Sequence, residues 1–234
     1  MARKVYTVSH PRSGLHWLRM MANYLVGDLA QGKRAFHFSH DYTLHPETAS
    51  RDRAKWFSKN VCFISRHPAD VSVSWYRIKT NGMRKVPGRI PIEMTIEDWV
   101  RSKTYGLPFV VSFYNDWALM RHKVRSFLIV RYEDMHRDVY LQLCRFLAFC
   151  GRKYSPDEMR RAIDYASFQK RQKSELEGEA LWEQPHRNVA DPQARFYRKG
   201  KVGSWREEIP EELHGFVNEQ IERLDPFYAY DGEA

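Results

Sequence analysis

The stretch VYTVSHPRSGLHWLRMMANYL, residues 5–25, decides the fold of this chain. Val5–Ser9 is a short run of residues that favour a β-strand, and an amphipathic helical pattern extends over Leu15–Leu29. The two patterns are joined only by the short turn HPRSG. A strand that passes directly into a helix predicts the start of a β-α-β unit.

The turn HPRSG has the composition of an anion-binding site. A turn from a strand into a helix presents backbone N–H groups and the positive end of the helix dipole, which together attract an anion. Arg12 adds a cation with a planar guanidinium, and Gly14 lets the backbone approach an anion closely. The alternative is an ordinary turn with a solvated arginine. Because the motif GxxxxGK[ST] is absent, the turn is not a Walker A loop, and ATP hydrolysis is disfavoured.

Three further β-rich runs lie along the chain, at Ala35–Ser39, Val61–Arg66 and Phe127–Arg131. Near-continuous apolar runs are typical of strands buried on both faces of a parallel sheet. Helical patterns lie between and after them, at Pro68–Lys79, Ile96–Lys103, Pro108–His122, Val139–Phe149, Pro156–Ala166 and Pro210–Leu224. This alternation predicts a three-layer α/β fold, a parallel sheet flanked by helices, with ligands bound beyond the carboxyl ends of the strands.

Composition sets the class of the protein and of its partner. The chain, 1–234, has the length of a single domain, and 38 Lys+Arg against 29 Asp+Glu give a formal charge of +9. Such an excess predicts a polyanionic partner, namely nucleic acid, an anionic membrane or a small phosphorylated ligand. We find no signal peptide and no membrane span in the sequence, and the three cysteines are expected to be reduced thiols of a cytoplasmic protein. The sequence gives no indication of oligomeric state.

A second cluster of polar residues lies in ISRHPADVSVSWY, residues 64–76. Arg66 closes a predicted strand, and Asp70 complements the dipole in the first turn of the helix that follows. Val71, Trp75 and Ile78 form the predicted buried stripe of that helix, which leaves Ser74 beside it. A guanidinium and a hydroxyl at the carboxyl end of a strand are suited to a second phosphate. The alternative is a surface arginine and a neutral helical serine.

A third cluster lies in a stretch without periodicity, residues 170–206, which we interpret as a functional flap. Its segment RFYRKGKVGSWR, residues 195–206, holds cations, aromatic rings and glycines but no acid. Taken alone, this segment could be an RNA-binding stripe or a solvated loop.

The order of four motifs, PRSG, RxPxDVxVSxY, YED and RKGxxGxW, resembles the sulfotransferases that use 3′-phosphoadenosine 5′-phosphosulfate (PAPS). The resemblance implies a P-loop NTPase-like fold and a 5′-phosphosulfate loop at His10–Trp17, in which Trp17 stacks on adenine. It further implies that Arg66 and Ser74 hold the 3′-phosphate. The nucleotide-binding residues it implies are Arg12, Ser13, Gly14, Leu15, His16, Trp17, Arg66, Ser74, Tyr132, Ser167, Phe168, Arg198, Lys199 and Gly200.

Four positions depart from the family pattern. Arg12 stands where the family has lysine, Leu15 and His16 stand where two threonines are frequent, and Ser204 stands where aspartate is usual. The exchange to arginine keeps the charge but changes its geometry.

The resemblance implies a histidine as general base, and His40 has the expected position just past the second predicted strand. His37 and His45 are the reserves, and Asp41 is a candidate to orient the His40 ring. A neutral imidazole can take the proton of an acceptor hydroxyl. Arg12 and Ser74 complete the expected catalytic set. A zinc site of the three histidines is disfavoured, because positions 37 and 40 face opposite sides of a strand, and no metal is expected.

The predicted reaction is transfer of a sulfuryl group from PAPS to an acceptor hydroxyl, with release of adenosine 3′,5′-bisphosphate (PAP). Only 22 residues separate Trp17 from His40, which predicts an open cleft and favours a glycan or natural-product hydroxyl over a small phenol. The alternatives are a basic nucleic-acid-binding module and a P-loop-like kinase. We expect PAPS and a hydroxyl-bearing acceptor as partners, and no nucleic acid.

Overall fold

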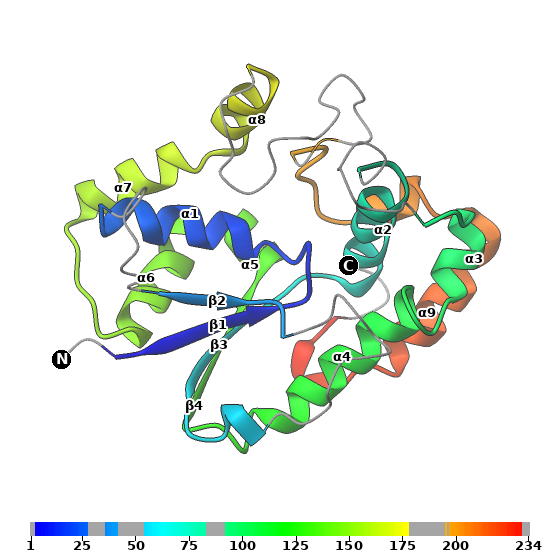
Figure 1. Cartoon of the computed structure of the whole chain (residues 1–234), viewed down its shortest axis with the longest axis horizontal. Coiled ribbons are helices and arrows are strands. Elements are labelled where there is room, and N and C mark those ends of the chain that lie inside the picture. Colours follow the sequence, from blue (N-terminus) through cyan, green and yellow to red (C-terminus); the bar gives the residue numbers. More distant parts are fainter. Residues whose placement is uncertain are drawn as a thin grey trace.

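The computed structural model describes residues 3–27, 36–41, 54–82, 92–177, 195 and 197–230. A parallel sheet of four strands in the order β2-β1-β3-β4 lies at its centre (Figure 1). The strands are β1 (Val5–Ser9), β2 (His37–Ser39), β3 (Asn60–Ser65) and β4 (Ser126–Arg131). Each one overlaps a predicted strand.

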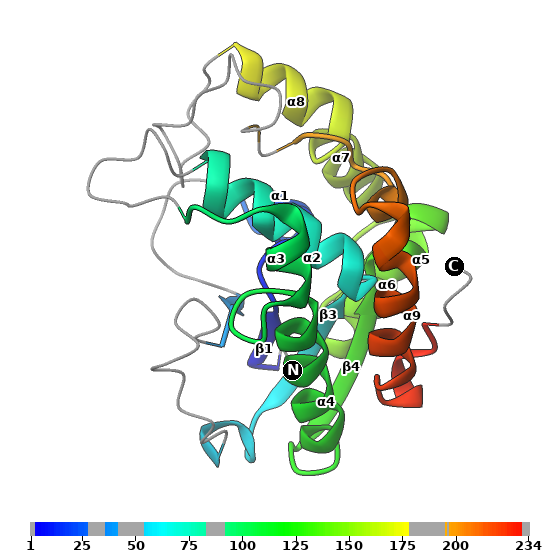
Figure 2. The same ribbon diagram turned by 90° about the vertical axis from the view of Figure 1, so that its right-hand side faces the viewer.

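Both faces of the sheet are buried, as its apolar strands predict. Val61 and Phe63 of β3 pack into one core cluster, while the alternating Cys62 and Ile64 pack into the other. Figures 1 and 2 show helices on both sides of the sheet. One cluster includes α1 (Leu15–Leu25), α5 (Tyr132–Arg137), α6 (Val139–Phe149) and α7 (Pro156–Tyr165); the other includes α2 (Pro68–Arg77), α4 (Leu107–Met120) and α9 (His214–Glu222). The predicted three-layer α/β fold is therefore confirmed.

The strands end together, and this common edge carries the turns that matter for function. Ser9 of β1 pairs with Ile64 of β3, and Ser65 pairs with Arg131 of β4. The turn into α1, the start of α2 and the start of α5 directly follow these ends. Three sequence motifs that lie far apart in the chain thus meet at one edge of the sheet.

Most predicted helices are present with shifted ends. The predicted stripe of α2 is buried, with Val71, Trp75 and Ile78 at 0%, 6% and 2% exposure, and a π-helical turn, Ile78–Gly82, continues that helix. The remaining helix of the predicted set is α3 (Ile96–Arg101). A short 3-10 turn, Glu211–Leu213, precedes α9, which therefore starts later than Pro210.

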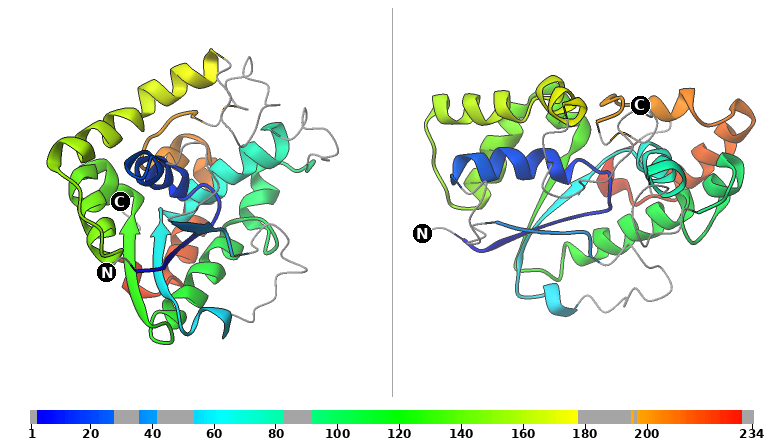
Figure 3. Two further views of the ribbon diagram at one scale, coloured as in Figure 1. Left: turned by 60° about the vertical axis from the view of Figure 1, so that its left-hand side comes forward. Right: turned by 45° about the horizontal axis from the view of Figure 1, so that its top comes forward.

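Two helices were not predicted. Helix α5 begins with the YED motif, and α8 (Phe168–Leu176) covers the start of the stretch predicted to be irregular. The expectation of an irregular flap from Lys170 was thus wrong over the residues of α8. Figure 3 shows α8 beside the segment that carries Arg198 and Lys199, drawn in orange.

The cysteines agree with the expectation of reduced thiols. Cys62, Cys144 and Cys150 are free thiols, and Cys62 and Cys150 are buried. Within the described ranges, every helix is too short or too polar to cross a lipid bilayer.

Candidate active site

The turn between β1 and α1 has two residues in the left-handed region, Arg12 with φ 75° and Gly14 with φ 98°. Gly14 is the residue before the first helical position, and its carbonyl accepts the N–H of Trp17 at 3.0 Å. A Cβ added to Gly14 would lie 2.6 Å from Cδ2 of Tyr132, at the start of α5. The turn therefore needs glycine for both its conformation and its close approach to α5.

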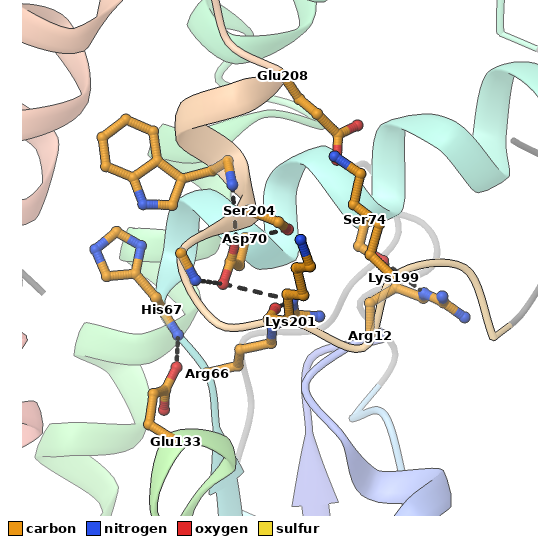
Figure 4. A network of polar contacts seen from close by, with 12 residues as sticks. Arg12, Arg66, His67, Asp70, Ser74, Glu133, Lys199, Lys201, Ser204 and Glu208 are labelled. Carbon is orange, nitrogen blue, oxygen red and sulfur yellow. Dashed lines mark hydrogen bonds and ion pairs between the residues drawn. The ribbon is translucent and has the colours of Figure 1, made fainter. Parts of the chain in front are cut away.

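Arg12 and Ser74 bring the first two sequence clusters together. Nε of Arg12 donates to Oγ of Ser74 at 2.9 Å, across 62 residues of sequence (Figure 4). The cation of the turn and the hydroxyl of α2 are thus adjacent at the edge of the sheet. This contact orients the guanidinium, because its Nε is hydrogen-bonded to the serine.

Arg66 connects the second cluster with the third. Its guanidinium donates to the backbone oxygen of Lys201 at 2.8 Å, forms an ion pair with Asp70 at 3.4 Å and lies 4.5 Å from the ring centre of Tyr132. The residue is only 8% exposed, and its Nε has no hydrogen-bond partner. A buried cation at the edge of the sheet thus sits under the segment 198–201.

Asp70 anchors the same segment to α2. Its carboxylate accepts hydrogen bonds from the N–H of Gly203 at 2.8 Å, the hydroxyl of Ser204 at 3.2 Å and the N–H of Trp205 at 2.9 Å. We had interpreted Asp70 only as a helix-dipole residue, and sequence spacing offers no signal for a contact across more than 130 residues. Ser204, which departs from the family pattern, is one of these donors.

Arg198 and Lys199 are held by carboxylates of the following turn. Arg198 binds Glu208 at 2.6 Å, and Lys199 binds Glu207 at 2.7 Å and Glu208 at 3.3 Å. Arg77 of α2 also binds Glu208, at 3.1 Å. Burial alone would raise the pKa of Glu208, but the hydrogen bonds and charges of these arginines outweigh it and lower that pKa.

Gly200 brings Phe168, one of the nucleotide-binding residues that the resemblance implies, into the site. Its φ is 61°, and a Cβ placed there would lie 2.6 Å from the ring of Phe168, the first residue of α8. Tyr197 extends the contact, because its N–H donates to the buried carboxylate of Glu175 at 2.9 Å. Ser167 is the residue before α8. The segment 197–200 therefore lies directly on α8.

An aromatic group lies between the turn and α5. The ring of Trp17 meets Tyr132 edge-on at 6.0 Å and His136 at 5.3 Å. Nε1 of Trp17 is buried and has no hydrogen-bond partner. Burial raises the pKa of Tyr132 and lowers that of His136. His136 is a residue that sequence reasoning missed, although its position four residues after Tyr132 puts both on one helical face.

Three other residues of the turn have different surroundings. Ser13 shares a hydrogen bond of 3.2 Å with the hydroxyl of Tyr114, which also binds the backbone of Arg66. His16 lies 3.1 Å from an Arg19 nitrogen. Leu15 is 5% exposed and its side chain packs into the core, and nucleotide binding by Leu15 stays a prediction.

His40 lies just beyond β2, with Nδ1 3.3 Å from the backbone oxygen of Ser9. Oγ of Ser9 lies 3.4 Å from the same Nδ1. A hydrogen on Nδ1 would be donated to the carbonyl and leave the lone pair on Nε2, whereas the hydroxyl can either donate to Nδ1 or accept from it. Asp41 accepts from Nε1 of Trp56 at 3.0 Å and pairs with Lys55 at 3.1 Å, so its carboxylate is directed to these side chains. His37 stacks on Tyr6, and His45 lies outside the described residues.

The described part of the chain contains no group of three or more His, Cys, Asp or Glu side chains that could hold a metal ion. The site brings together four cations that can bind an anion. They are Arg12, Arg66, Arg198 and Lys199, drawn from three separate segments.

Comparisons with known proteins bear on this geometry. The family described as sulfotransferase domain matches residues 54–228. A flavonol 3-sulfotransferase of Flaveria bidentis is 24% identical over 79% of this chain and 56% of its own length. A 3-beta-hydroxysteroid sulfotransferase of Cavia porcellus is 24% identical over 95% of this chain and 81% of its own length. The chain thus spans between about half and four fifths of such relatives.

Solved structures show the same fold. The mouse sulfotransferase SULT7A1 complexed with PAP matches with a TM-score of 0.65 and 18% identity, over 94% of this chain and 83% of that one. Retinol dehydratase in complex with androsterone and PAP matches with a TM-score of 0.63 and 16% identity, over 94% and 79%. Because the family match covers most of the chain and the fold agrees throughout, the protein belongs to the PAPS-dependent sulfotransferase family.

Proposed function

We propose that this protein transfers a sulfuryl group from PAPS to an acceptor hydroxyl and releases PAP. The observation that carries the proposal is the contact of 2.9 Å between Arg12 and Ser74. It joins the anion-binding turn to α2, so that one cationic centre stands at the turn and a second, Arg66, stands under the segment 198–201. Two such centres suit a ligand with phosphate groups at both its 5′ and 3′ positions.

The residues present fit this donor. Nε1 of Trp17 and Nε of Arg66 are buried without hydrogen-bond partners, and Gly14 packs against the ring of Tyr132. In our proposal, Arg12 and the N–H group of Gly14 hold the 5′ end, and the N–H of Ser13 closes the turn by donating to the His10 carbonyl. Trp17 and Phe168 contact the adenine. The 3′-phosphate is held by Arg66, Ser74, Arg198 and Lys199, with Tyr132 and Gly200 beside it.

His40 acts as the general base. PAPS supplies the sulfuryl group, which passes to the acceptor oxygen as the bond from sulfur to the 5′-phosphate oxygen breaks. In this proposal Nδ1 of His40 donates to the Ser9 carbonyl, and Nε2 takes the proton of the acceptor hydroxyl. Arg12 stabilises the negative charge that develops on the departing phosphate oxygen, and Ser74 keeps its guanidinium oriented.

The acceptor is a glycan or natural-product hydroxyl in this proposal, with a phenol as the second choice. The names of two relatives, a flavonol and a 3-beta-hydroxysteroid sulfotransferase, add support for a ring-bearing natural product. We also propose that residues 1–234 act as a single cytoplasmic domain. Its two core clusters share one sheet, and its three cysteines are free thiols.

The deciding experiment is calorimetric titration with PAP, with ADP and ATP–magnesium as controls. Selective binding of PAP supports the proposal, after which labelled PAPS would be offered with a flavonol, a hydroxysteroid, a phenol and an oligosaccharide. A preference for ATP–magnesium would contradict the proposal and favour a kinase. Tight oligonucleotide binding that falls steeply with salt, without PAP binding, would favour the nucleic-acid alternative.

A further inference from the structure

His10 is a buried histidine within the phosphate-binding turn. It directly follows β1, and its ring is 0% exposed. The rings of Trp75, Phe109 and Phe113 surround it edge-on, with centroids at 6.1, 6.0 and 5.7 Å. Trp75 is the neighbour of Ser74 on α2. The imidazole therefore packs between the turn and the helix that carries the hydroxyl partner of Arg12.

The hydrogen-bond pattern fixes the tautomer of this ring. Nδ1 of His10 lies 2.8 Å from the backbone oxygen of Pro11, which can only accept, so Nδ1 carries a hydrogen. Burial lowers the pKa of His10 to about 3, against the hydrogen bond to Pro11, which raises it, and with a smaller lowering by the charge of His40, so the ring stays neutral. His10 is thus a permanent Nδ1–H donor.

The surroundings of Nε2, the other ring nitrogen, show what a histidine contributes at position 10 that a phenylalanine would not. Nε2 of His10 is buried and has no hydrogen-bond partner. An unpartnered nitrogen in an aromatic cage is unfavourable, and a phenylalanine in this cage would avoid it. The contribution that histidine alone makes here is therefore the hydrogen bond to Pro11.

That bond acts on Arg12. The Pro11 carbonyl and the nitrogen of Arg12 belong to the same planar peptide group. A hydrogen bond that holds the carbonyl therefore also holds this peptide plane, relative to which φ of Arg12 is defined. Arg12 has φ 75°, a conformation that a non-glycine residue adopts only when its surroundings hold it. The N–H of Ser13 donates to the carbonyl of His10 at 3.3 Å and closes the turn.

We infer that His10 is a positioning residue for sulfuryl transfer: its Nδ1–H holds the Pro11 carbonyl, and so keeps Arg12 in the left-handed conformation that directs its guanidinium to Ser74 and the donor's 5′ end. The inference rests on the proposed function. It assigns to His10 no contact with the donor or the acceptor.

Two variants separate the roles of the ring and the hydrogen bond. His10→Phe keeps an aromatic ring in the cage but has no donor, whereas His10→Asn keeps an N–H donor near the position of Nδ1. Calorimetry would compare PAP with adenosine 3′-phosphate, which lacks the 5′ group. We expect His10→Phe to lose about tenfold in PAP affinity, as for one net hydrogen bond. Its affinity for adenosine 3′-phosphate stays unchanged, and His10→Asn stays within about threefold of the wild type for both ligands.

Two results would overturn the inference. If His10→Phe binds PAP as tightly as the wild type, the hydrogen bond does not position Arg12. If it loses both ligands equally, the effect is a general loss of structure. Failure of the wild type to bind PAP would instead refute the proposed function, and with it the role in sulfuryl transfer.

A second measurement needs no nucleotide and no variant that folds poorly. Long-range proton–nitrogen NMR spectra of the native protein report the tautomer of each histidine. We expect His10 to be the Nδ1–H tautomer, without titration between about pH 5 and 8. An Nε2–H tautomer, or a ring that titrates in that range, would overturn the inference even if PAP binds.

Discussion

The backbone N–H of Trp205 donates to Oδ1 of Asp70 at 2.9 Å, across 135 residues of sequence. The same carboxylate accepts from Gly203 and Ser204 and pairs with Arg66. Asp70 is 1% exposed, so these contacts are shielded from water. One carboxylate therefore joins the start of α2, the buried cation and the segment that carries Arg198 and Lys199 (Figure 4).

Replacement of this carboxylate should weaken both the fold and the donor site. In Asp70→Asn the side chain loses its charge, leaves Arg66 without its buried partner and places an amide N–H against other donors. We expect the free energy of unfolding to fall by about 2–4 kcal/mol. PAP affinity should fall at least tenfold, as roughly one charged hydrogen bond would predict. Urea denaturation and calorimetry measure the two effects.

The matched control is Asp157→Asn. Asp157 also lies in the first turn of its helix, α7, but its ion pair with Arg160 is exposed, at 76% and 68% for the two side chains. We expect a change of less than about 0.5 kcal/mol and unchanged PAP affinity. Equal losses in the two variants would show that helix-dipole effects, and not the contacts to residues 203–205, explain the role of Asp70.

Gly14 should tolerate no side chain. In Gly14→Ala, the new Cβ meets the Tyr132 ring at 2.6 Å while φ stays near 98°. We expect a loss of about 1–3 kcal/mol in unfolding free energy and weaker PAP binding. Gly215→Ala is the control, because Gly215 lies in α9 with nothing within 4 Å of a new Cβ. This control should gain about 0.5–1 kcal/mol, and a comparable loss in both variants would refute the argument.

The pattern of apolar residues along the sequence predicted the strands and helices that are buried through their own apolar side chains. The strands follow from apolar runs, and α2 follows from its stripe of Val71, Trp75 and Ile78. In contrast, α8 has no apolar stripe from which it could be predicted, since its sequence FQKRQKSEL is polar. Its buried residues include Ser174 and Glu175. Glu175 is buried because it accepts the N–H of Tyr197, a contact that exists only in the folded chain.

The candidate site likewise contains residues that the sequence predicted and supporting residues that it did not. Arg12, Arg66, Ser74 and Tyr132 stand at strand ends or beside them, so the sheet brings them together as parallel topology predicts. Their supports could not be read from spacing. Tyr114 on α4 and Glu208 after the segment 197–203 make their contacts across 48 and 131 residues, and nothing in their own sequence surroundings marks them.

His40 should be needed for turnover and not for donor binding. In His40→Ala we expect turnover of PAPS, with an acceptor that the wild type sulfates, to fall by about 10²–10⁴-fold, the usual contribution of a general base. PAP affinity should stay within about twofold of the wild type, because no donor-binding role is assigned to this ring. His37→Ala is the control, since His37 stacks on Tyr6 in the neighbouring strand. Equal loss of binding and turnover in His40→Ala would identify a structural histidine instead.

Two buried histidines should make the fold sensitive to acid. Burial lowers the pKa of His10 to about 3 and that of His67 to about 4, from an ordinary value of 6.5. The folded state therefore favours the neutral rings, so their contribution is complete above about pH 6.5 and is lost as the pH falls and the unfolded chain takes up protons. Each ring lowers the free energy of unfolding by at most roughly 1.4 kcal/mol for each pH unit of acidification. The two rings together lower it by about 2–3 kcal/mol per pH unit between pH 6 and 4.

The slope can be assigned by removing one ring at a time. His67 stacks on Trp205 with centroids 5.7 Å apart and planes 4° from parallel, and neither of its ring nitrogens has a hydrogen-bond partner. His67→Phe should therefore keep the stack and lose the titration. Urea denaturation at pH 7, 6 and 5 should show a slope smaller by roughly 1 kcal/mol per pH unit for this variant, while His10 and His136, whose pKa values burial also lowers, still contribute. An unchanged slope would mean that His67 is already protonated in the folded protein, and that its ring faces a carboxylate or water rather than the closed surroundings seen beside Trp205.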